Sequence, residues 1–191
     1  KLPKILNAFD AIVIGGSMHD SIKRNEKPWM KRTFKFIEKV AEQNIPILGI
    51  CGGLQFTVRA FRGEVIRNPK GREFGTINVG LTVAGKQDNL FKGLPAAFLA
   101  QSSHKCMARN LRPGWRLLAS SDLCLLQAIA VGKNIRLLQF HPEMTARQLR
   151  ALAHYKKEPV PNIKNAERYG KKILNNFLKY FILPYHKKKL L

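Results

Sequence analysis

Cys51 is the residue with the clearest chemical potential in this sequence, because of the glycines around it. The segment Gly49-Ile50-Cys51-Gly52-Gly53 follows an apolar run and precedes apolar residues at helical spacing. A cysteine at a strand-to-helix turn, with glycine two positions before and after it, is the sulfur counterpart of the Gly-x-Ser-x-Gly nucleophile elbow. The start of the helix favours a thiolate at this position. The segment therefore predicts a cysteine nucleophile; a buried cysteine in a glycine-rich turn is the alternative.

A thiolate nucleophile needs a base, and His141 is the histidine best placed to serve as one. It ends a strand-like pattern and stands two residues before Glu143. Pro142 stops the strand and restricts the backbone between them, so that the carboxylate can accept a hydrogen bond from the imidazole. Strand ends on one sheet edge can meet in space, so we expect Cys51 and His141 to lie together. An exposed His-Pro-Glu turn is the alternative interpretation.

The elements that must position these residues alternate between strand and helix in the first part of the chain. Residues 11–14 and 46–50 are short apolar runs that end at glycines, as buried parallel strands do. Pro28 opens a helical pattern between them. Such alternation predicts an α/β sheet.

The middle of the chain has a different pattern, with strand-like segments separated by turn residues and no helical stretch between them. These segments are residues 76–84, 98–102, 116–120, 125–131 and 135–140. They predict a mixed or antiparallel extension of the sheet. A last helix is expected over residues 166–181, with apolar side chains on one face.

Length and charge narrow the class of protein. The chain has 191 residues, 34 Lys and Arg, and 12 Asp and Glu, which give a net charge of +22. This length suits one domain, and the apolar runs are too short to span a bilayer. The charge would suit binding to nucleic acid or an anionic membrane. No aromatic-rich RNA-binding signature accompanies it, so a solvated basic surface is the preferred interpretation. Three irregularly spaced cysteines fit a reducing, cytoplasmic compartment.

Several segments together resemble the class I glutamine amidotransferases, in particular the group called GMP synthase-like. Gly49-x-Cys51-x-Gly53-x-Gln55 stands 90 residues before His141-x-Glu143, in that family's triad order. Four further segments resemble the same group, in order along the chain: Ile14-Gly15-Gly16-Ser17, Lys27-Pro28-Trp29-Met30, Gly71-Arg72-Glu73-Phe74-Gly75, and Gln127-Ala128 followed by residues 138–145. The resemblance and the alternation together imply a flavodoxin-like fold, an open and mostly parallel sheet with helices on both faces and the antiparallel extension.

The resemblance also implies roles for individual residues. Cys51 would attack the side-chain amide of glutamine, His141 would carry protons, and Glu143 would orient His141. The backbone N–H groups of Gly16 and Gly52 would form the oxyanion hole. The products would be glutamate and ammonia, formed through a glutamyl thioester, with no metal and no cofactor.

Substrate contacts are expected from a second set of residues. Gln55 would help hold the amino-acid end of glutamine, and Ser103, Lys105 and Cys106 would line the substrate site. Cys106 stands where the nearest relatives often have an acid, so contacts from its backbone are expected to replace side-chain ones. His104 is expected to be structural or substrate-adjacent rather than catalytic.

The resemblance leaves the boundaries and the activity of the chain open. Family members normally have a strand-and-helix unit before this starting point, so we expect a single, N-terminally shortened domain over residues 1–191, with residues 1–10 as the tail of that unit. Glutamine hydrolysis that supplies ammonia to a separate synthetase or acceptor chain is the first hypothesis. A γ-glutamyl hydrolase or peptidase with the same triad, and a non-catalytic basic scaffold that binds nucleic acid or a partner protein, are the alternatives.

Overall fold

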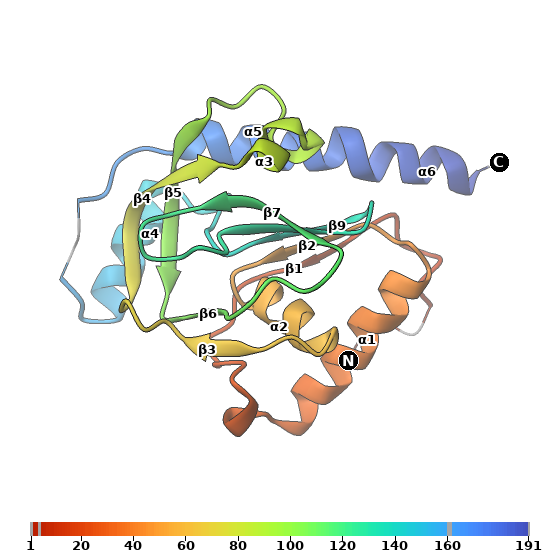
Figure 1. The fold of residues 1–191 in the computed structure, drawn as a ribbon, viewed down its shortest axis with the longest axis horizontal. Helices are drawn as coiled ribbons and strands as arrows, with labels where there is room; N and C mark the ends of the chain where they lie inside the picture. Colours follow the sequence, from red (N-terminus) through yellow and green to blue (C-terminus); the bar gives the residue numbers. More distant parts are fainter. Residues whose placement is uncertain (1, 4, 160–161, 191) are drawn as a thin grey trace.

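A seven-stranded sheet forms the centre of the protein in the computed structural model, which describes residues 2–3, 5–159 and 162–190 (Figure 1). Lys1 and Lys4 of the expected N-terminal tail lie outside the described residues. The strands are ordered β1 (Ile12–Ile14), β2 (Ile47–Ile50), β9 (Ile135–Leu138), β8 (Ala128–Val131), β7 (Trp115–Ser120), β4 (Glu73–Leu81) and β5 (Ala97–His104).

The sheet has a parallel part and an antiparallel part. β1, β2 and β9 pair in parallel, and β8, β7, β4 and β5 continue the sheet with antiparallel pairing. The expected α/β fold with an antiparallel extension is therefore confirmed. The carboxyl ends of the three parallel strands meet at one edge. The glycine loop follows β1, Cys51 follows β2, and His141 comes three residues after the end of β9.

Helices cover both faces of the sheet, as expected (Figure 1). On one face, α1 (Pro28–Glu42) and α2 (Gly52–Ala60) bury Ile37, Val40 and Leu54. On the other face, α5 (Glu167–Phe177) buries Ile173 and Phe177. Burial of large apolar side chains of this kind stabilises a fold by about 1.5–3 kcal/mol each. The two apolar cores hold the parallel strands between them.

The chain between β4 and β5 differs from the sequence prediction. β4 ends at Leu81 rather than at residue 84, and α3 (Val83–Gln87) and the 3-10 turn η2 (Asn89–Phe91) follow it. The expectation that no helix interrupts the middle strands is therefore wrong. Thr82 ends the strand because its hydroxyl donates to the Leu117 carbonyl at 2.7 Å and accepts from the Gly85 N–H at 3.0 Å, which caps the helix.

Other elements extend or add to the predicted set. The last helix continues past residue 181 through a π-helical turn, η3 (Leu178–Ile182), into α6 (Leu183–Lys189). A helix not predicted from the sequence, α4 (Ala146–Tyr155), follows the His-Pro-Glu segment. β3 (Val65–Arg67) and β6 (Cys106–Ala108) form a separate two-stranded sheet, and η1 (Lys23–Asn25) precedes α1. β3 and β6 are missed because each has only three residues and is defined by its distant partner.

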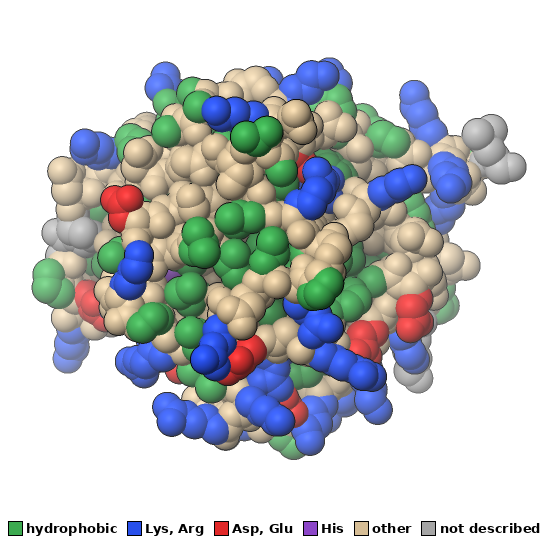
Figure 2. All heavy atoms as spheres, in the orientation of Figure 1, with side chains coloured by type: hydrophobic (Ala, Val, Ile, Leu, Met, Phe, Trp, Pro, Cys, Tyr) green, Lys and Arg blue, Asp and Glu red, His purple; other side chains and the backbone are tan. Residues whose placement is uncertain are grey.

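Basic residues lie at many places on the face of the molecule shown in Figure 2. On the face shown in Figure 2, Lys and Arg side chains are spread among acidic and apolar ones rather than gathered into one stripe. Within the described ranges, no helix has the length and apolar character that crossing a bilayer requires.

We predict that Gly53→Ala destabilises the fold, because a β-carbon at Gly53 would lie 2.0 Å from the Ile14 carbonyl oxygen of β1. Overpacking of this kind costs about 3 kcal/mol, which corresponds to a fall in Tm of about 6–12 °C. Thermal unfolding followed by circular dichroism measures this. Gly80→Ala is the matched control, since the nearest atom to its β-carbon is 4.0 Å away. Equal Tm values for the two variants would contradict the prediction.

Candidate active site

Cys51 occupies a strained turn between β2 and α2. Its backbone has φ 51° and ψ −102°, in a region that residues other than glycine rarely adopt. Such a conformation costs about 1–3 kcal/mol and persists only where the surroundings impose it. Its N–H donates to the Leu138 carbonyl at 2.7 Å, which fixes the turn against β9. A β-carbon at Gly49 would lie 2.8 Å from Leu137 Cδ2, and one at Gly52 would lie 2.6 Å from the Ser17 nitrogen. The glycines around Cys51 are therefore required by close contacts.

The glycine loop after β1 brings Cys51 and His141 to one point. A β-carbon at Gly16 would lie 3.2 Å from His141 Cε1 and 4.0 Å from Cys51 Cβ. Cys51 is 6% exposed and His141 is 7% exposed. The side chains of Cys51 and His141, which lie 90 residues apart in the sequence, thus meet beside Gly16, which has no side chain.

His141 is held in place by its backbone and by a carboxylate. Its N–H donates to the Gln101 carbonyl at 2.8 Å, and its Nδ1 lies 2.7 Å from Glu143 Oε1. Burial lowers the pKa of His141, but hydrogen bonds with Cys51 and Glu143 outweigh burial and raise that pKa from 6.5 to about 10. The hydrogen bonds therefore favour the protonated form of the imidazole beside the sulfur.

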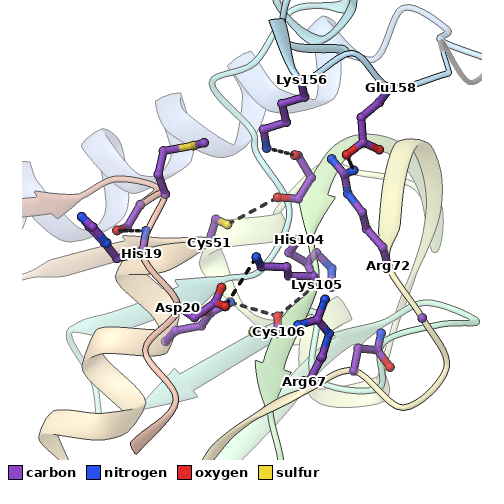
Figure 3. A pocket seen from close by; sticks show the side chains of 16 residues that line it. His19, Asp20, Cys51, Arg67, Arg72, His104, Lys105, Cys106, Lys156 and Glu158 are labelled. Atoms are coloured by element: carbon purple, nitrogen blue, oxygen red, sulfur yellow. Dashed lines mark hydrogen bonds and ion pairs between the residues drawn. The ribbon is translucent and has the colours of Figure 1, made fainter. Parts of the chain in front are cut away.

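A cavity of about 620 Å³ lies in front of Cys51 (Figure 3). All four residues predicted to contact substrate, Gln55, Ser103, Lys105 and Cys106, line it together with Cys51. The other described residues of its lining are Ser17, Met18, His19, Asp20, Arg67, Asn68, Gly71, Arg72, His104, Lys156 and Glu158. The structure thus brings the substrate-contact candidates together around the sulfur.

The four candidates differ in what they offer to a ligand. The Ser103 carbonyl oxygen lies 4.0 Å from Cys51 Sγ, so Ser103 borders the reacting atom. The Gln55 amide donates to the Cys106 carbonyl at 2.9 Å and accepts from the Ser21 hydroxyl at 3.2 Å, so its polar atoms are already engaged. Lys105 pairs with Asp20 at 3.5 Å. Burial raises the pKa of the Cys106 thiol to about 11, which leaves that thiol inert at neutral pH.

His104 belongs to a second imidazole–carboxylate pair, which is buried. Its Nε2 lies 2.8 Å from Glu73 Oε2, and its Nδ1 lies 3.1 Å from the Cys106 carbonyl oxygen. Ser102 and Ser121 donate to Glu73 at 3.1 and 2.5 Å. Burial raises the pKa of Glu73, but the hydrogen bonds from His104 and Ser121 outweigh it and lower that pKa. This pair joins β4 to β5, the strand that carries Ser103, and His104 also lines the cavity. The position agrees with both roles expected for His104, structural and substrate-adjacent.

The sequence did not single out every residue of the cavity. Lys156 and Glu158 follow α4, a helix absent from the sequence prediction, and Glu158 forms an ion pair with Arg72. Asp20 comes from the loop after β1. Arg72 stood in a segment that marked the resemblance, but nothing in its spacing indicated a place in the cavity. Only the three-dimensional arrangement assigns these residues to the site.

Comparisons with known proteins agree with this geometry. The family model described as "Glutamine amidotransferase class-I" matches residues 1–154. A GMP synthase (glutamine-hydrolyzing) subunit from Pyrococcus furiosus is 37% identical over 111 residues, which are 58% of this chain and 57% of that protein. The protein of the same name from Methanocaldococcus jannaschii is 33% identical over 153 residues, which are 80% of this chain and 69% of that protein.

Solved structures share the fold. A Thermoplasma acidophilum protein superposes with a TM-score of 0.75 at 26% identity, over 97% of this chain and 79% of that one. A glutamine amidotransferase from Thermotoga maritima gives a TM-score of 0.79 at 24% identity, over 94% of this chain and 80% of that one.

Fold and site together define an open α/β protein in which a cysteine on a strand-to-helix turn faces a histidine–glutamate pair. The chain belongs to the class I glutamine amidotransferase family, as the match over residues 1–154 shows. It spans 57% of the length of its Pyrococcus relative.

We predict that Glu143→Gln lowers the pKa of His141 by about one unit, because the imidazolium loses a charged hydrogen-bond partner. One unit corresponds to about 1.4 kcal/mol. Because the pKa of His141 is higher in the folded protein, the pair contributes stability fully below pH 6.5 and loses it as the pH rises to about 10. Imidazole NMR titration and urea unfolding at several pH values measure both effects.

The exposed Glu42→Gln variant is the control for this experiment. The free energy of unfolding of Glu143→Gln should fall below that of the control in acid and approach it near pH 10. A stability difference that grows toward pH 10 would disprove this account of the pair.

Proposed function

We propose that the described fold is one amidotransferase domain that hydrolyses the side-chain amide of glutamine, with Cys51 as nucleophile. The observation that carries this proposal is the meeting of Cys51 and His141 over Gly16, with Glu143 behind the imidazole. An imidazolium beside a thiol stabilises the thiolate, which is the attacking form. The cavity of about 620 Å³ provides room for an amino acid in front of the sulfur.

In the first half of the proposed reaction, Cys51 Sγ attacks the amide carbon of glutamine. As the C–N bond breaks, His141 gives its proton to the leaving nitrogen, and ammonia departs. A γ-glutamyl thioester on Cys51 remains. Glu143 keeps the imidazole oriented toward the sulfur throughout, since its carboxylate holds Nδ1 at 2.7 Å.

In the second half, water attacks the thioester carbon. His141, now neutral, takes a proton from that water, and the C–S bond breaks to release glutamate. His141 is then protonated again and Cys51 is again a thiolate, as at the start of the reaction. No oxidant, metal or further reactant is required by this sequence of steps.

Backbone N–H groups are the proposed donors to the negative oxygen that develops in both halves. Gly52 is the first residue of α2, where an N–H has no partner within the helix. Gly16 lies in the loop that touches Gly52, since a β-carbon at Gly52 would lie 3.1 Å from the Gly16 carbonyl carbon. Loss of one such donor commonly costs 10²–10³ in rate.

The names of the relatives suggest where the ammonia goes. The curated relatives from Pyrococcus furiosus and Methanocaldococcus jannaschii each carry the name of one subunit of a glutamine-hydrolyzing GMP synthase. We propose by analogy that this chain works with a separate synthetase chain, which accepts the ammonia.

We predict that Cys51→Ala lowers glutamine hydrolysis by at least about 10⁴-fold, because the nucleophile is lost. The measurement is ammonia release from glutamine. Cys124→Ala is the matched control: Cys124 is fully buried, and burial raises its pKa to about 12, so its loss should leave the rate within a few fold. Undiminished turnover in a clean Cys51→Ala preparation would reject the mechanism. Release of glutamate from γ-glutamyl peptides, but not from glutamine, would favour a γ-glutamyl hydrolase instead.

We predict that Gly16→Ala lowers kcat/KM by about tenfold or more while the protein stays folded, because its β-carbon would press on His141 at 3.2 Å. The neighbouring Gly15→Ala is the control, since no atom lies within 4 Å of its β-carbon. Both variants are assayed for ammonia release and for Tm. A Gly15→Ala defect as large as that of Gly16→Ala would refute the claimed contact.

A further inference from the structure

The wall of the cavity in front of Cys51 holds four Lys and Arg side chains with different surroundings: Arg67, Arg72, Lys105 and Lys156. Arg72 forms an ion pair with Glu158, and Lys105 pairs with Asp20 at 3.5 Å. Arg67 lines the cavity from β3 and is exposed, so water weakens its attraction for an anion. The two paired cations and the hydrated Arg67 therefore attract a small anion less strongly than an unpaired, half-buried cation does.

Lys156 is the exception in this wall. It follows the last turn of α4 and is half-buried, and its Nζ donates to the Ser103 hydroxyl at 3.4 Å. Within the part of the chain that the structure describes, no carboxylate forms an ion pair with Lys156. Burial is the main cause that lowers the pKa of Lys156, and the positive charge of Arg72 adds to it. The charges of Glu158 and Cys51 act in the opposite direction but do not outweigh these two causes. A partly desolvated ammonium that no carboxylate contacts gains from an incoming anion.

Lys156 and Cys51 lie in the wall of the same cavity and have Ser103 as a common neighbour. Lys156 and Cys51 both contact Ser103, the first through the hydroxyl and the second near the carbonyl oxygen at 4.0 Å (Figure 3). The ammonium and the thiol therefore border the same cavity and share one neighbour. Glutamine carries its amide and its α-carboxylate at opposite ends, with the two carbons roughly 5 Å apart when the molecule is extended. One substrate thus offers a reacting group to the thiol and an anionic group to the ammonium.

We propose that Lys156 binds the α-carboxylate of the substrate and thereby selects free glutamine over glutamine within a peptide. This inference rests on the proposed function and names the group that gives it specificity. The Arg72–Glu158 ion pair supports the assignment, because it neutralises the carboxylate two residues from Lys156. Glu158 still attracts the ammonium, but its pairing with Arg72 leaves Lys156 without a direct carboxylate contact.

The test compares kcat/KM for glutamine with kcat/KM for glutamine α-amide, which lacks the α-carboxylate charge. In the wild type, glutamine should be preferred. In Lys156→Met, kcat/KM for glutamine should fall about 10- to 100-fold, mainly because KM rises, and kcat/KM for the α-amide should change little. Lys156→Arg should recover part of the preference. Lys171→Met, on the exposed side of α5, is the control and should match the wild type.

Two other outcomes separate this inference from the proposed function. In the first, the wild type hydrolyses glutamine, but Lys156→Met keeps the full preference for glutamine over the α-amide or loses kcat/KM equally on both substrates. In either case the role of Lys156 is wrong and the proposed function stands. If the wild type does not hydrolyse glutamine, the function and the inference both fail. Calorimetric binding of glutamine to Cys51→Ala, with and without Lys156→Met, gives a second readout: an unchanged Kd would overturn the role of Lys156.

Discussion

The site depends on one steric constraint, the close approach of three strand ends at the edge of the parallel sheet. The loop after β1, the turn after β2 and the segment after β9 converge until a β-carbon at Gly16 would lie 3.2 Å from His141. Hydrogen bonds from the Cys51 N–H to Leu138 and from the His141 N–H to Gln101 fix the approach. The strained backbone at Cys51 is maintained because both apolar cores hold these strands in register. Rigid elements thus place the sulfur and the imidazole within reach of one another.

Two imidazole–carboxylate pairs lie near the cavity, and their surroundings give them different roles. The His141–Glu143 pair lies beside the sulfur, and the hydrogen bonds to Cys51 and Glu143 raise the pKa of His141. The His104–Glu73 pair lies within the sheet, where Ser102 and Ser121 satisfy the carboxylate. In the proposed mechanism the first pair exchanges protons with a substrate at the sulfur, whereas the second pair joins β4 to β5. The same two residue types therefore serve chemistry or structure according to what they touch.

Sequence patterns predicted the parts of the site that depend on local chain geometry. The glycines around Cys51 marked its turn, and Pro142 marked the end of the strand before Glu143, because such residues are required by backbone shape. The parallel strands and their covering helices followed from apolar runs. The sheet β3–β6, the capped helix after Thr82 and the placement of Lys156 could not be predicted in this way. Each depends on contacts between distant segments, which leave no periodic signal in a single sequence.

In the proposed mechanism His141 keeps Cys51 reactive, and the pH dependence of Cys51 alkylation shows whether it does. Iodoacetamide labelling of the Cys51 peptide, followed by mass spectrometry from pH 5 to 10, compares the wild type with His141→Ala. Labelling of the wild type should be rapid at neutral pH, whereas labelling of His141→Ala should be slow there and recover only in alkali. Coincident pH profiles for the two proteins would rule out this role of His141.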